Sequence, residues 1–164
     1  MFVPASLVVA IAIPLAVGLA GSMSTAGAVR SAWYRNLAKP SWQPPSALFA
    51  PVWTALYVLM GLASWLVWTR LGARWGALLA YPLVAYAVQL ALNGAWTPVF
   101  FARESPRAAL AIMVLLLAAV LETVRAFGGV DPRAALLMLP YLAWTCFAAA
   151  LNARIVQLNP PPSS

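Results

Sequence analysis

Aromatic and amide side chains recur at helical spacing in three stretches of the chain. An aromatic face offers a stacking surface, and an amide offers a hydrogen-bond donor and an acceptor. Around one cavity, such residues would bind a flat hydrophobic ligand. For any one residue, core packing or an interhelical hydrogen bond explains it equally well. The three sets, each sharing one helical face, are Phe49, Trp53 and Tyr57; Gln89, Asn93, Trp96, Thr97 and Phe100; and Pro140, Trp144, Ala148 and Asn152.

The chain lacks the side chains on which most enzyme chemistry depends. It has no His, a single Cys (Cys146) and three acidic residues. These counts exclude His- or Cys-based metal sites, disulfide frameworks, Cys–His nucleophiles and acid–base triads, so no metal site is predicted. With no His to activate it, Cys146 is expected to be a small buried hydrophobic residue. Any reaction would have to run through indole side chains and the ligand.

Composition places these residues in a membrane. Charged residues make up 8% of the 164 residues and hydrophobic types 64%, whereas an ordinary soluble domain has about 25% charged residues. The uncharged stretches are 1–29, 40–69, 75–102, 108–121 and 134–153, and a spanning helix needs about 20 apolar residues. We expect an all-α bundle of five transmembrane helices in one domain, 1–158. The expected helices are 4–28, 46–68, 77–102, 106–126 and 133–157, with a loop at 29–45 and a disordered tail at 159–164.

The net charge of +7 is scattered singly over both ends of the expected helices. We therefore expect contact with anionic lipid headgroups and no binding of nucleic acid. The end with the first loop and the C-terminus carries six basic residues, and the other end carries four. This excess predicts that the end with the first loop faces the cytoplasm.

Glu122 precedes Arg125 by three positions and is expected to pair with it. A paired carboxylate weakens the hypothesis of a proton-coupled transporter.

The first loop is dense in proline and aromatic residues, whereas a flexible tether would be rich in Gly and Ser. Prolines fix φ and oppose helix formation, and large amphipathic rings add apolar surface. We expect a semi-rigid lid over one mouth of the bundle, built from Pro40, Pro44, Pro45, Trp33, Tyr34 and Trp42. By contrast, Trp65, Trp68 and Trp75 flank two arginines and are interpreted as an aromatic belt at the membrane interface.

Small side chains recur at four-residue spacing in the third expected helix. They include Ala80, Ala87 and Ala91, and they lie on a different side from Asn93. Small residues let two helices approach closely. The pattern predicts either a homodimer contact or packing within the same bundle.

Five motifs follow one another along nearly the whole chain. They are W-Y-x-x-L-x-K-P-x-W-x-P-P at 33–45, W-x-x-x-Y at 53–57, Q-x-x-x-N-x-x-W-x-x-x-F-F at 89–101, P-Y-x-x-W at 140–144 and L-N at 151–152. In order and spacing they resemble the translocator protein family. That family comprises the tryptophan-rich sensory proteins of bacteria and the mitochondrial peripheral benzodiazepine receptor, and the resemblance is to a bacterial member.

The resemblance implies a homodimeric five-helix bundle in a bacterial membrane, with a pocket under the first loop. The pocket would bind porphyrins such as protoporphyrin IX, and haem, as ligands, with no cofactor required. By motif position it would use Tyr34, Trp53, Asn93, Trp144 and Ala148. The helical faces add Trp96 and Thr97, and the first loop adds Trp33. Trp53 and Trp144 match the two tryptophans that the family is proposed to use in light-dependent porphyrin breakdown.

The family's sterol motif at the end of the fifth helix needs a Tyr. Here the sequence after Leu151 is N-A-R-I-V-Q-L, with no aromatic residue, so at most weak sterol binding is expected. Three functions stay open, in this order: a receptor or sensor for tetrapyrroles, an enzyme that degrades porphyrin with light and oxygen, and a transporter of porphyrin or sterol.

Overall fold

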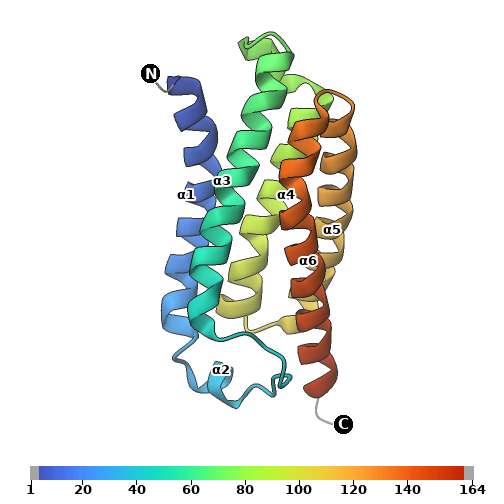
Figure 1. Ribbon diagram of the computed structural model, residues 1–164. Helices are drawn as coiled ribbons and strands as arrows, with labels where there is room; N and C mark the ends of the chain where they lie inside the picture. Colours follow the sequence, from blue (N-terminus) through green and yellow to red (C-terminus); the bar gives the residue numbers. More distant parts are fainter. Residues whose placement is uncertain (1–3, 161–164) are drawn as a thin grey trace.

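In the computed structural model, which describes residues 4–160, five long helices run side by side (Figure 1). They are α1 (Ala5–Ala28), α3 (Ser46–Arg70), α4 (Tyr81–Thr97), α5 (Pro106–Gly128) and α6 (Pro132–Leu158). By length and composition, five helical segments of 19 to 27 residues could each cross a membrane. The expected all-α bundle is confirmed, and no strand occurs in residues 4–160. Of the tail expected to be disordered, residues 161–164 lie outside the described part of the chain.

The two ends of the bundle differ in their connections (Figure 1). At one end lie the start of α1, the 3₁₀-helix η1 (Trp75–Leu79) and the turn from α5 to α6. At the other end lie the first loop with its short helix α2 (Ala32–Asn36), the connection from α4 to α5 and the end of α6. We call the second end the lid end.

The third helix begins later than expected, at Tyr81, and ends in a widened turn. Pro82 lies in the first turn of α4, and its ring would clash with the carbonyl of the residue four positions earlier, so an α-helix cannot run through from 77. The chain forms η1 there, and Ala80 is extended and caps α4. Pro98 then opens the π-helix η2 (Pro98–Ala102), in which Arg103 N donates to Pro98 O at 3.0 Å.

Helix α1 is attached to the bundle through a close backbone approach to α3. A Cβ added at Gly61 of α3 would lie 2.5 Å from Ile11 Cα in α1. One at Gly18 of α1 would lie 2.2 Å from the Tyr57 ring of α3. Most other side chains of α1 are exposed or half-buried, so these two glycines set how closely the helix packs.

Asp131 holds the α5–α6 turn to the end of α3. Its side chain caps α6 by accepting from Arg133 N at 2.9 Å, and its Oδ2 accepts from Arg133 Nη2 at 2.8 Å and from Arg70 Nε at 3.2 Å. The Arg133 guanidinium, followed by Arg70, holds the pKa of this carboxyl well below its ordinary value. The carboxylate therefore joins three segments of the chain at this end.

Near the same end lie the predicted pair of Glu122 with Arg125 and two tryptophans of the expected aromatic belt. Glu122 Oε1 accepts from Arg125 Nη2 at 2.6 Å, as predicted, and also from the Tyr81 hydroxyl at 2.6 Å. Trp75 is 86% exposed, which suits a residue at the membrane interface. Trp65 Nε1 donates to Ser6 Oγ at 3.2 Å and thus also holds α1 to α3.

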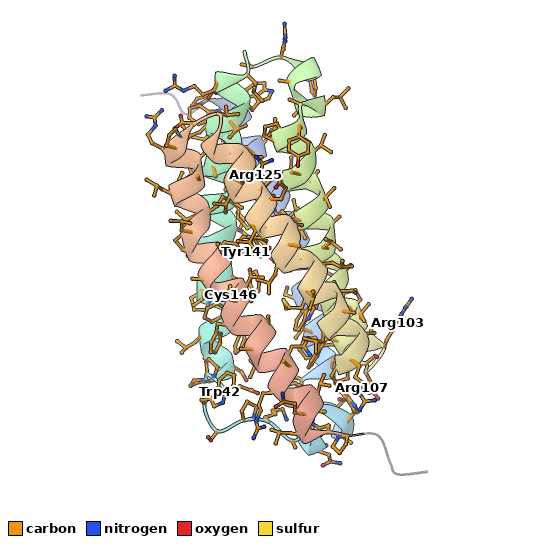
Figure 2. The ribbon with its side chains drawn as sticks, turned by 90° about the vertical axis from the view of Figure 1, so that its right-hand side faces the viewer. Trp42, Arg103, Arg107, Arg125, Tyr141 and Cys146 are labelled. Carbon is orange, nitrogen blue, oxygen red and sulfur yellow. The ribbon has the colours of Figure 1, made fainter. Side chains whose placement is uncertain are left out.

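The inward face of α6 differs from the expected one. Its fully buried residues include Met138, Tyr141 and Thr145, whereas Pro140, placed on the inner face by sequence spacing, is exposed. The expectation that Cys146 is buried is wrong, because its thiol side chain is exposed. Each residue of an α-helix is rotated by about 100° from the last, so a cysteine that follows inward-facing Thr145 points outward. Tyr141 and Cys146 both lie midway along α6 (Figure 2).

Candidate functional site

The first loop packs its aromatic side chains onto the π-helix. Ser31 caps α2 by accepting from Tyr34 N at 3.1 Å. The helix thereby presents Trp33 against Phe100, with ring centroids 5.9 Å apart, and Tyr34 against Phe101, at 5.6 Å. Two successive rings of the loop thus meet two successive rings of η2. This contact closes the lid end over the space between the helices.

Hydrogen bonds fix the loop in this position. The Asn159 side chain at the end of α6 accepts from Ala38 N at 3.0 Å and donates to Ala38 O at 2.9 Å. The Lys39 ammonium donates to the carbonyls of Tyr34 and Leu37 and lies 4.3 Å from the centre of the Tyr34 ring. Partial burial lowers the pKa of Lys39. The loop is therefore bound to its own backbone and to α6.

The prolines of the loop continue this ordered path into α3. Pro40 is buried, Pro44 is half-buried and Pro45 caps α3 with φ −54°. Trp42 packs edge-on against Phe147 of α6, at 5.7 Å between centroids, and remains 47% exposed. Figure 2 shows Trp42 at the lid end of the molecule, beside the start of α3. These contacts describe an ordered cover of the kind the proline pattern predicts.

Inside the bundle, hydrogen bonds join α3, α4 and α6 in one buried network. The Tyr57 hydroxyl donates to Asn93 Oδ1 at 2.8 Å. Asn93 Nδ2 donates to the Tyr141 hydroxyl at 3.1 Å, which in turn donates to Gln89 Oε1 at 3.0 Å. Amides in an apolar interior are costly unless bonded. The network explains why both amides of α4 point inward, and it leaves Gln89 Nε2 without a partner in residues 4–160.

Trp53 and Trp144 border this network from two sides. Trp53 stacks on Tyr57 at 5.4 Å between centroids and meets Tyr141 edge-on at 6.2 Å. Trp144 lies edge-on to Phe49 at 5.8 Å. Its indole nitrogen Nε1 is buried and has no hydrogen-bond partner among the described residues. Ala148, one turn further along α6, is half-buried at the edge of the core.

Trp96 of α4 contacts both α6 and a ring that the lid covers. Its Nε1 donates to Asn152 Oδ1 at 3.1 Å, and Asn152 Nδ2 donates to Pro106 O at 2.9 Å. Its ring stacks on Phe100 at 5.0 Å, the same ring that receives Trp33. Among the described residues, the ring contacts around the expected site form three separate groups. One joins Trp33, Tyr34, Trp96, Phe100 and Phe101, a second joins Trp42, Phe49, Trp144 and Phe147, and a third joins Trp53, Tyr57 and Tyr141. We call Trp33, Trp53, Trp96, Trp144 and the rings that they contact the aromatic layer.

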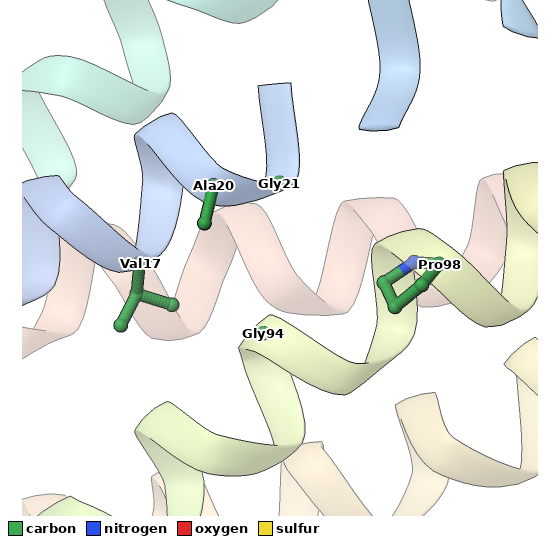
Figure 3. Close-up of a pocket in the computed structure, with 5 residues that line it drawn as sticks. All are labelled: Val17, Ala20, Gly21, Gly94 and Pro98. Atoms are coloured by element: carbon green, nitrogen blue, oxygen red, sulfur yellow. The ribbon is translucent and has the colours of Figure 1, made fainter. Parts of the chain in front are cut away.

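Thr97 is the member of the expected site that faces elsewhere. A Cβ added at Gly21 of α1 would lie 3.3 Å from Thr97 Oγ1, so its side chain is directed toward α1. A shallow apolar cleft of about 240 Å³ lies beside it between α1 and α4, lined by Val17, Ala20, Gly21, Gly94 and Pro98 (Figure 3). This cleft is separate from the aromatic layer.

A second cleft, of about 300 Å³, lies at the lid end between α2, the start of α5 and the end of α6. Among its lining residues only Trp33 belongs to the expected site. Its lining residues are Trp33, Leu37, Glu104, Ser105, Pro106, Arg107, Val156 and Asn159.

Three residues near the expected site were not predicted from the sequence. Tyr141 is the centre of the polar network, Phe147 receives Trp42, and Asn159 holds the lid. Met138, Tyr141 and Thr145 follow helical spacing and are buried, but apolar residues on the other sides of α6 hide this face in the sequence. Asn159, next to a run of prolines, carried no signal of its role.

The small-residue stripe lies largely on the outside of α4. Ala87 and Ala91 are exposed, with Val84 and Val88 beside them at 41% and 50% exposure. Ala80 is half-buried and precedes the helix as its cap. The stripe is therefore open to lipid or to another chain.

Comparison with known proteins gives consistent matches. The model of the TspO/MBR family matches residues 10–158. The chain is 44% identical to the tryptophan-rich protein TspO of Chlorobaculum tepidum, over 94% of this chain and 96% of that protein. It is 41% identical to the tryptophan-rich sensory protein of Cereibacter sphaeroides, over 85% of each chain. It is also 45% identical to the human translocator protein, over 73% of this chain and 70% of that one.

Proposed function

The chain belongs to the TspO/MBR family and is an integral, multi-pass membrane protein, and from this premise we propose that it binds porphyrins such as protoporphyrin IX, and haem, within the aromatic layer. Membership of this family supports a membrane receptor or sensor role. Porphyrin would be the ligand to which such a receptor responds.

The buried indole nitrogen of Trp144 is the observation that carries this proposal. A buried donor with no partner costs about 1–3 kcal/mol, and this one belongs to a ring that meets Phe49 edge-on and Phe147 at a tilt. A porphyrin combines a flat π face with carboxylate and ring-nitrogen acceptors. The porphyrin face would replace ring contacts such as that of Phe49 with Trp144. One of the porphyrin's acceptor atoms would accept a hydrogen bond from the Trp144 N–H.

Entry of such a ligand requires the lid to move. The rings of Trp33 and Tyr34 cover Phe100 and Phe101, so the aromatic layer is closed at this end. The contacts that hold the lid are a few hydrogen bonds and ring contacts, each of which contributes about 0.5–1.5 kcal/mol. Opening would therefore be a local event that leaves the five-helix bundle intact.

Light- and oxygen-dependent porphyrin degradation is a second candidate. The ring of Trp53 contacts both Tyr57 and Tyr141, and indole and phenol side chains are the redox-active groups available in this site. Trp53 and Trp144 would donate electrons to a photo-excited porphyrin, and dioxygen would be the oxidant. Transport of porphyrin or sterol is a third function, for which the site offers no separate feature, and sterol binding is expected to be weak.

A homodimer through α4 forms part of the proposal. The exposed stripe of Ala87 and Ala91, flanked by Val84 and Val88, gives a second helix a surface for close approach.

Titration with protoporphyrin IX, in the dark and under light, tests both candidates. The purified full-length chain in detergent is expected to show saturable quenching of tryptophan fluorescence in the dark. The double variant Trp53→Phe with Trp144→Phe is expected to bind protoporphyrin IX more weakly, because it lacks the Trp144 N–H, and at saturating porphyrin to lose the light-driven decrease in porphyrin absorbance. Trp75→Phe, which alters an 86% exposed ring, is the matched control. Absence of saturable quenching would refute the binding site, and bleaching at the wild-type rate in the double variant would refute the enzyme.

A further inference from the structure

The cleft at the lid end carries two charged side chains that the rest of the protein leaves unpaired. Glu104 and Arg107 both line it, and neither makes an ion pair or a side-chain hydrogen bond within residues 4–160, even with the other. The neutral polar groups there are already engaged. Ser105 Oγ accepts from Ala108 N at 3.4 Å, and Asn159 is bonded to Ala38.

By the length and composition of the helices, the cleft lies where the apolar spans end, the level expected for lipid headgroups. The span that includes α4 and η2 ends at Ala102, that of α5 begins at Pro106 and that of α6 ends at Leu158. Glu104 therefore lies just outside the spans, and Arg107 in the first turn of α5. Arg103 and Arg107 extend from this end of the molecule (Figure 2). A lipid of the adjacent leaflet would present its phosphate and headgroup at this level.

The remaining wall of the cleft is apolar. Trp33, Leu37 and Val156 contribute ring and aliphatic surface, which suits a glycerol backbone and the first methylene groups of the acyl chains. A volume of about 300 Å³ is at the lower limit for a ligand pocket. It accommodates a headgroup while the acyl chains stay in the bilayer.

The signs of the two free charges select among headgroups. A purely anionic headgroup would gain from Arg107 but meet repulsion from Glu104, and a choline headgroup has no N–H to donate to the carboxylate. We propose that this cleft binds the headgroup of an aminophospholipid, with Arg107 on the phosphate diester and Glu104 on the primary ammonium. Both contacts are charge-assisted hydrogen bonds, and a guanidinium can bind two phosphate oxygens at once. This site is independent of the porphyrin proposal.

Lipid retention by the full-length chain tests the assignment. The protein in detergent micelles receives equal amounts of phosphatidylethanolamine, phosphatidylglycerol and phosphatidylcholine with identical acyl chains, and native mass spectrometry counts the lipids that stay bound. We expect phosphatidylethanolamine to be retained in preference to the other two. Glu104→Gln should abolish that preference, and Arg107→Gln should weaken retention about ten-fold, the loss of one charge-assisted contact.

Arg103→Gln is the matched control, because it removes the same charge four positions away without changing a residue that lines the cleft. It is expected to leave the preference unchanged. Arg107→Lys keeps the positive charge but lacks the planar guanidinium that can bind two phosphate oxygens. It should therefore retain an intermediate amount of lipid, even if Arg107→Gln fails to fold. Circular dichroism checks the helices of each variant.

Three outcomes would overturn the proposal. Retention of phosphatidylglycerol by the wild type as strongly as phosphatidylethanolamine would show that the site does not select the ammonium group. Arg103→Gln could reduce retention as much as Arg107→Gln, which would indicate a diffuse basic surface. Soluble glycerophosphoethanolamine could compete as well as the lipid does, which would assign the cleft to a water-soluble ligand.

Discussion

The side chain of Asn159 binds the backbone of Ala38 through two hydrogen bonds, one in each direction, across 121 positions of sequence. An amide side chain here does what a neighbouring strand does in a sheet, satisfying both the N–H and the C=O of one residue. It is the point at which the lid meets the end of α6.

Asn159→Ala is expected to loosen the lid without unfolding the bundle. Both groups of Ala38 would lose their protein partner, so amides of the first loop should exchange hydrogen faster, while those of α3 and α6 stay protected. Hydrogen exchange followed by mass spectrometry measures this. Gln157→Ala, which removes a side chain bonded only to Arg154 at the surface, is the control. Equal exchange of the loop in both variants would show that the lid is held by its ring contacts instead.

Asn93→Leu is expected to destabilise the bundle by about 1–3 kcal/mol, the cost of an unsatisfied buried polar group. The Tyr57 hydroxyl would lose its acceptor, whereas the Tyr141 hydroxyl would keep Gln89 Oε1. Thermal unfolding in detergent, followed by circular dichroism, measures the change. Thr54→Val removes an exposed hydroxyl bonded within its own helix and should shift the midpoint little. An unchanged midpoint in Asn93→Leu would mean that the network adds nothing to stability.

Gly61→Ala is expected to push α1 away from α3. The new Cβ would lie 2.5 Å from a backbone atom of Ile11, and backbone cannot move aside as the end of a side chain can. Overpacking of this kind costs about 1–3 kcal/mol. Gly76→Ala, where nothing lies within 4 Å of the added Cβ, is the matched control. Thermal midpoints of the two variants should therefore differ, and equal midpoints would contradict the close approach.

The pH dependence of stability should contain a contribution from Asp131. Its pKa in the folded protein lies well below the ordinary value of 3.8, chiefly because of Arg133. A lowered folded-state pKa means that the stabilisation is fully present above pH 3.8 and is lost as pH falls toward the folded-state pKa. Asp131→Asn should lower the thermal midpoint at neutral pH. The gap to wild type should narrow in acid, and a gap that stays constant below pH 3.8 would assign the effect to something other than titration.

The five-helix architecture could be predicted because charge is excluded from hydrocarbon, so uncharged stretches of spanning length mark the helices directly. The start of α4 could not be read from hydropathy, since an apolar stretch continues through η1 and only Pro82 breaks the helix. Spacing assigned Trp53 and Asn93 each to one face of its own helix, and in the structure both contact Tyr57.

Contacts between distant segments were beyond sequence reasoning. The outward direction of Cys146 depends on a rotation of α6 by about one residue, and apolar residues on all sides of this helix leave that rotation undetermined in the sequence. Asn159 can bond to the lid only because the end of α6 lies beside Ala38. That position depends on the lengths of all five helices together, which the sequence does not fix closely enough.

The packing of the lid depends on the number of residues in the widened turn Pro98–Ala102. Phe100 and Phe101 receive Trp33 and Tyr34 one to one because both rings leave a π-helical turn, which holds one residue more than an α-helical turn. Deleting Val99 or Ala102 would restore an ordinary turn and rotate one ring away from its partner, although every aromatic residue would be kept. Closure of this end of the molecule is thus sensitive to insertions and deletions in a segment where it would tolerate many substitutions.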